Sequence, residues 1–128
     1  MKYLCLAFEE ESKLNALTRE QWASLRQETL DYVKDLRESG HLIVTEPLKS
    51  ASSAVSLRVR DGNLSTTDGP FAETKEQLGG IFLIDARDLN EAIQIAAGWP
   101  SARIGTIEVR PVEAELRHEG RYAPTQVY

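Results

Sequence analysis

The 128-residue sequence holds one cysteine, two histidines and no glycine-rich phosphate-binding motif. A single thiol, Cys5, rules out an internal disulfide, and its apolar neighbours favour a buried, inert side chain over a nucleophile. One cysteine and two distant histidines have none of the spacings that zinc sites use. We therefore expect no bound transition metal, and the missing phosphate loop predicts no flavin or nucleotide cofactor.

Long apolar runs and an excess of positive charge are also missing. No segment approaches the roughly 20 apolar residues that cross a bilayer, and the short run 3–8 leads straight into three glutamates, unlike a signal peptide. With 15 basic and 20 acidic residues the net charge is −5, which argues against nucleic acid as a partner. The sequence therefore predicts a cytoplasmic protein that binds neither membrane nor nucleic acid.

What is present is the composition of one globular domain, 41% apolar and 27% charged. Residues 3–8 and 81–84 are short, continuous apolar runs, which are typical of central strands. A capping box at Thr18 and Gln21 predicts a helix that ends at Gly40. A second helix is expected to begin at Asp88 and to end near Gly98 and Pro100. Trp22 and Trp99 are expected in the core.

Further short strands fall between and after these helices. A β-prone run at 41–45 ends before Pro47, and apolar and polar residues alternate through 55–60 and 105–112. Residues 64–67 are expected to return as a short hairpin partner of 55–60 across the turn at 61–63. The main order is β-α-β-β-α-β, which predicts an α+β, ferredoxin-like fold with an antiparallel sheet and an extra short hairpin strand.

In this topology the first and third strands are central, and the strands at Val55 and Ile107 are expected at the edges. The domain is expected to span residues 1–112, followed by a charged C-terminal tail at 113–128. Two helices can cover only one face of the sheet, yet the central strands are apolar on both faces. A second copy of the chain is the expected cover, which predicts a homodimer.

Residues 67–80, TDGPFAETKEQLGG, resemble the signature of the YCII-related family, which is also known by its DGPF motif. The segments FLID at 82–85, DLNEA at 88–92 and EVRP at 108–111 are also similar to it. The resemblance implies a dimeric α/β barrel, a bacterial origin and an association with extracytoplasmic-function sigma factors. It implies no particular reaction.

The signature loop supplies most of the candidate site residues. Asp68, Glu73 and His41 are the catalytic candidates, because carboxylates and imidazole can transfer protons. The ligand-binding candidates are Lys75, Arg58 and Phe71. Each also has a structural explanation: Asp68 suits the turn at Gly69-Pro70, His41 follows a helix end, Glu73 and Lys75 fit a solvated turn, Arg58 fits a strand surface, and Phe71 fits a dimer seam.

Two function classes stay open. One is a dimer that binds a small molecule, or acts on it without a cofactor, through the acidic loop at a cleft. The other is a non-catalytic accessory or regulatory module that associates with an extracytoplasmic-function sigma factor. An acid of the loop that faces a closed cavity would favour the first class, and an open surface would favour the second.

Overall fold

A computed structural model describes residues 1–113 of the chain, so most of the predicted tail lies outside the described residues. The elements follow in this order: β1 (Lys2–Glu9), α1 (Glu11–Asn15), α2 (Arg19–Glu38), β2 (Leu42–Pro47), the 3-10 turn η1 (Ala51–Ser53), β3 (Val55–Arg60), β4 (Asn63–Asp68), β5 (Gln77–Asp85), α3 (Leu89–Ala97), the 3-10 turn η2 (Pro100–Arg103) and β6 (Thr106–Pro111).

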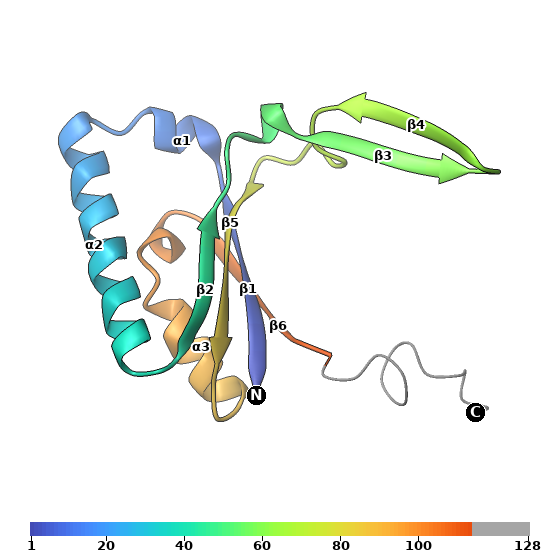
Figure 1. The fold of residues 1–128 in the computed structure, drawn as a ribbon. Helices are drawn as coiled ribbons and strands as arrows, with labels where there is room; N and C mark the ends of the chain where they lie inside the picture. The colour runs from blue at the N-terminus through green and yellow to red at the C-terminus, as the bar shows by residue number, and fades with distance from the viewer. Residues whose placement is uncertain (114–128) are drawn as a thin grey trace, which may run out of the picture.

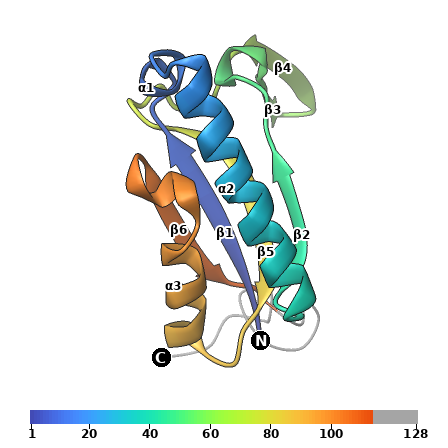
Figure 2. The same ribbon diagram turned by 90° about the vertical axis from the view of Figure 1, so that its left-hand side faces the viewer.

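Four strands form one antiparallel sheet in the order β2-β5-β1-β6. The helices α2 and α3 lie on one face of this sheet, as Figure 1 and Figure 2 show. The ferredoxin-like α+β fold predicted from the sequence is confirmed, with β1 and β5 at the centre and β6 at one edge.

The strand at Val55 is not the second edge strand, and that prediction was wrong. The edge position is taken by β2, from the short run predicted at 41–45, while β3 pairs only with β4 in a separate two-stranded sheet. Alternation shows that a strand has two unlike faces, but it does not show which strand is its partner. Pro47 ends β2 before the hairpin and Gly69-Pro70 follows β4 after it, so neither strand of the hairpin continues a strand of the main sheet.

The core lies between the sheet and the two helices. Tyr3 and Cys5 of β1 and Phe82 and Ile84 of β5 are at most 2% exposed. Trp99 is buried as predicted and stacks on Phe82 at 3.9 Å between ring centroids. Aromatic stacking and apolar burial therefore hold η2 against the centre of the sheet.

Both predicted helix starts are confirmed. Thr18 Oγ1 accepts a hydrogen bond from the Gln21 amide, and Gln21 Oε1 accepts one from the Thr18 amide. Asp88 caps α3 by accepting a hydrogen bond from the Glu91 amide.

Trp22 is 49% exposed, contrary to the prediction, because it lies in the first turns of α2 beside a cavity. No helix within residues 1–113 is long and apolar enough to cross a membrane.

The other face of the sheet carries apolar side chains too. Strand alternation and pairing place Leu4 of β1 opposite Leu83 of β5, and Leu6 opposite Ile81, on the side away from the helices. All four are partly exposed. No described helix covers this face, which we call the open face (Figure 1).

Candidate functional site

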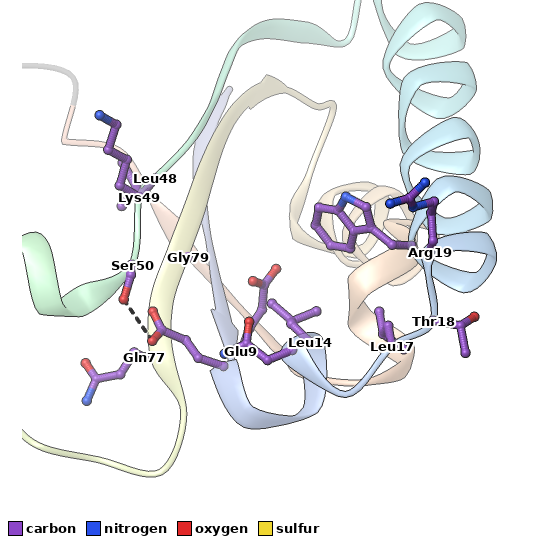
Figure 3. A pocket seen from close by; sticks show the side chains of 13 residues that line it. Glu9, Leu14, Leu17, Thr18, Arg19, Leu48, Lys49, Ser50, Gln77 and Gly79 are labelled. Atoms are coloured by element: carbon purple, nitrogen blue, oxygen red, sulfur yellow. Dashed lines mark hydrogen bonds between the residues drawn. The ribbon is translucent and has the colours of Figure 1, made fainter.

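A cavity of about 540 Å³ lies where β1 ends and α2 begins, a volume suited to a small organic molecule (Figure 3). Its walls come from β1, α1, the first turns of α2, the segment after β2 and the start of β5. The lining residues are Glu9, Glu11, Leu14, Asn15, Leu17, Thr18, Arg19, Trp22, Leu48, Lys49, Ser50, Gln77 and Gly79.

Glu9 is placed in the cavity by the pleat of β1. Tyr3, Cys5 and Ala7 face the helices and are buried, and Glu9 continues the same row by two residues. The apolar core ends at Ala7 and the cavity begins beyond it, so the last side chain of this row, Glu9, lines the cavity and not the core. Gly79 leaves room for it, because a Cβ at position 79 would lie 2.5 Å from Glu9 Oε2.

Burial raises the pKa of the Glu9 carboxyl above its ordinary value. The nearby Ser101 hydroxyl lowers this pKa, and the negative charge of Glu11 raises it. Ser101 Oγ is itself buried and has no hydrogen-bond partner within the described residues. It nevertheless lies close enough to Glu9 to lower the pKa of that carboxyl. Glu9 also has no ion pair among residues 1–113, so no cation offsets its desolvation.

Glu11 is engaged by neutral donors. Its Oε1 accepts a hydrogen bond of 2.8 Å from the Ala51 amide, and its Oε2 accepts one of 3.0 Å from the Ser50 hydroxyl (Figure 3). The second acid of the cavity is therefore a structural link between α1 and η1. Glu9 remains the carboxylate with acceptor capacity for a ligand.

Two cations and one aromatic ring complete the cavity wall. Arg19 and Lys49 are exposed and form no ion pair with Glu9 or Glu11. Figure 3 shows the Lys49 amino group pointing away from Glu9. Trp22 adds a half-exposed indole that can pack against an organic ligand.

The candidate residues of the signature loop do not line this cavity. Asp68 ends β4 and is exposed, and Glu73 is exposed in the loop that follows. Phe71 is 78% exposed, with the Arg58 guanidinium 5.3 Å from its ring centroid. Lys75 Nζ lies 3.8 Å from Glu10 Oε1. Of the residues 68–77, Gln77 alone lines the cavity.

His41 lies at the opposite end of the sheet, just before β2. Its Nδ1 is 2.7 Å from Ser39 Oγ, and its Nε2 is 3.4 Å from Glu91 Oε1. The pKa of Glu91 is lowered, chiefly because the backbone amide of Arg87 donates to it. The predicted catalytic set of Asp68, Glu73 and His41 is therefore divided between two ends of the molecule.

The sequence does not mark Glu9 as a site residue, because it is the first of three consecutive glutamates directly after the apolar run 3–8. The available signal was the period of two, which predicts that residue 9 shares the face of residues 3, 5 and 7. Within residues 1–113, no three His, Cys, Asp or Glu side chains form a group that could hold a metal ion.

Fold and cavity together define a ferredoxin-like α+β domain with a half-buried carboxylate at one end of its core. Residues 1–115 match the model of the YCII-related domain. The chain is also 35% identical over 114 residues to an uncharacterized protein, R00369, of Rhizobium meliloti (strain 1021), covering 88% of this chain and 92% of that protein. The chain belongs to the YCII-related family.

Proposed function

We propose that this protein binds a small organic molecule in the cavity at Glu9 and exchanges a proton with it there. The observation that carries the proposal is a carboxylate with a raised pKa and no cation partner among residues 1–113, at a cavity of about 540 Å³. A pKa moved toward neutrality suits a group that both takes up and releases protons. Glu9 replaces the loop acids Asp68 and Glu73 as the acid of the site.

The chemistry needs no cofactor. The Glu9 carboxylate would accept a proton from a C–H, N–H or O–H group of the ligand, so that this bond breaks and a carboxyl O–H forms. The proton would then return to another atom of the same ligand or to water. Leu14, Leu17 and Trp22 would hold the apolar part of the ligand, and Gln77 would offer it a neutral amide.

A thermal-shift screen of small metabolites tests this function, because a ligand of the folded state raises its melting temperature. We expect at least one compound to shift the wild-type protein by about 2 °C or more, and the shift to disappear in Glu9→Gln. Glu38→Gln, at the exposed end of α2, is the control and should keep the shift. Asp68→Asn and Glu73→Gln should keep it too. Loss of binding in these two loop variants alone would place the acid of the site in the loop instead.

We also propose that the protein is a homodimer in which the open faces of two sheets meet. The support is the apolar pairing of Leu4 with Leu83 and of Leu6 with Ile81 on a face that no described helix covers. Light scattering should give twice the 14.3 kDa of one chain. Leu83→Glu should split the dimer, because it would bury a charge without a partner. A wild-type protein that is monomeric at micromolar concentration would contradict the dimer.

The exposed positions of Asp68 and Glu73, outside the cavity, are what the accessory role with an extracytoplasmic-function sigma factor predicts for the loop, so that role is kept as a second proposal. The cytoplasmic location stays a prediction. A stable complex with a sigma factor, unaffected by Glu9→Gln, would favour that role over a ligand-binding one.

A further inference from the structure

The hairpin of residues 55–68, which we call the arm, carries apolar side chains on one face. Val59 pairs with Leu64 and Leu57 pairs with Thr66, so the pleat places Val55, Leu57, Val59 and Leu64 on the same side. Their exposed fractions are 61%, 64%, 55% and 66%. Four large aliphatic side chains that are each more than half exposed form an apolar strip, not isolated surface residues.

The arm has little support of its own. A two-stranded hairpin in water is at best marginally stable. Within residues 1–113 its anchors are at the base: the Gly69 amide donates to Ala54 O at 2.7 Å, and the Ser56 hydroxyl donates to Gly69 O at 2.9 Å. The Arg58 guanidinium over Phe71 adds a cation–π contact there. The apolar strip itself contributes to stability only if another surface covers it.

The arm projects on the side of the sheet that the helices leave uncovered. Figure 1 shows it leaving one end of the sheet away from α2, and Figure 2 shows it behind the sheet as seen from the helices. The open face with Leu4, Leu6 and Leu83 is on the same side. One chain therefore has two apolar surfaces, the open face of the sheet and the strip on an arm that projects from the same side of the sheet.

The size of these surfaces indicates what covers them. A six-residue strand is about 20 Å long and strands lie about 4.8 Å apart, so the open face has a flat footprint of about 400 Å² and the arm one of about 200 Å². Side-chain relief increases the accessible area beyond the footprint. The two surfaces together approach the roughly 800 Å² per partner that a stable interface buries, whereas the arm alone is far below it.

We infer that the arm packs its apolar strip on a second copy of this chain, so that the two arms of a dimer clasp each other's subunits. A two-fold interface is self-complementary, and this chain supplies both surfaces that such an interface needs. This inference rests on the proposed dimer and adds to it: the open faces meet at the centre, and each arm extends the contact over the partner.

Light scattering on the full chain tests the arm directly. The double variant Leu57→Ser/Leu64→Ser keeps strand length but removes the apolar strip, and we expect its dimer dissociation constant to rise at least 100-fold. Arg60→Ser/Thr67→Ser changes two residues on the opposite face of the arm and is the matched control, which should stay dimeric. A wild-type monomer would refute the proposed dimer itself. A wild-type dimer that persists in the double variant would refute the clasp alone.

Hydrogen exchange on the wild-type protein gives a second test that needs no variant. If the arm packs on a partner, amide exchange across residues 55–68 should be slow at high concentration and should accelerate on dilution below the dissociation constant. Exchange in the arm that is fast at every concentration, in a protein that scatters as a dimer, would overturn the inference. This measurement decides the question even if the double variant fails to fold.

Discussion

Gly79 lies beneath the carboxylate of Glu9, at a distance that leaves no room for a side chain. A Cβ at position 79 would lie 2.5 Å from Glu9 Oε2 and 3.0 Å from its Cδ. Since β1 and β5 are neighbours in the sheet, this contact sets the position of the acid within the cavity. Glycine is needed at position 79 for space, because its backbone is not in the left-handed region.

Gly79→Ala should therefore weaken ligand binding more than it weakens the fold. The end of the Glu9 side chain can move aside, so the free energy of unfolding should change by less than about 1 kcal/mol. The displaced carboxylate should reduce the affinity of a ligand found in the thermal-shift screen about tenfold. Urea denaturation and titration calorimetry measure the two effects. Unchanged affinity would mean that Glu9 does not contact the ligand.

Glu9 should also make stability depend on pH. Because the folded-state pKa of Glu9 is raised, the folded protein holds this proton at pH values where the unfolded chain has released it. The contribution of Glu9 to stability is therefore unfavourable above the folded-state pKa and vanishes below the unfolded-state pKa. We expect Glu9→Gln to be more stable than wild type near pH 7 and to lose this advantage as the pH falls toward 4. Denaturation curves across this range that differ by a constant amount would contradict the prediction.

Cys5 should be inert in the native protein. Its side chain is fully buried, and burial raises the pKa of the thiol to about 12. At pH 8 about one molecule in 10,000 would then hold a thiolate, even if a reagent could reach it. We expect a thiol reagent to react with Cys5 only as fast as the protein unfolds, and stoichiometrically in denaturant. Rapid labelling of the folded protein would show that β1 opens locally.

Gly98→Ala should destabilise the fold. Tyr32 OH donates a 2.6 Å hydrogen bond to Ile95 O, and a Cβ at position 98 would overlap the Tyr32 phenol. Forcing the ring aside breaks this bond and disturbs its edge contact with Trp99, so we expect a loss of about 1–3 kcal/mol. Tyr32→Phe removes only the hydrogen bond and should cost about 1 kcal/mol. Equal losses in the two variants would argue against the steric explanation.

The fold was predictable because its elements have strong local signals. The apolar runs of β1 and β5, the Thr18 cap and the Asp88 cap each specify their own element, and the order of elements limits the topology. The position of the arm was not predictable in this way. Its alternation is the same whether Val55 and Leu57 face a core or face outward, and only long-range pairing decides between the two.

The cavity depended on contacts between distant segments. Glu9, Thr18, Ser50 and Gln77 meet in space although they are far apart in the chain, and no local pattern marks them as a group. The signature loop is rich in acidic and turn residues, yet turn chemistry alone explains much of that composition. The period of two in β1 was the one sequence signal that pointed to Glu9.

Glu11 joins the cavity to the base of the arm. One of its oxygens holds the Ala51 amide and the other holds the Ser50 hydroxyl, both in the short turn from which β3 departs. These two hydrogen bonds tie α1, which lines the cavity, to the turn that precedes the arm. Two regions that are separate in sequence are mechanically linked through one side chain.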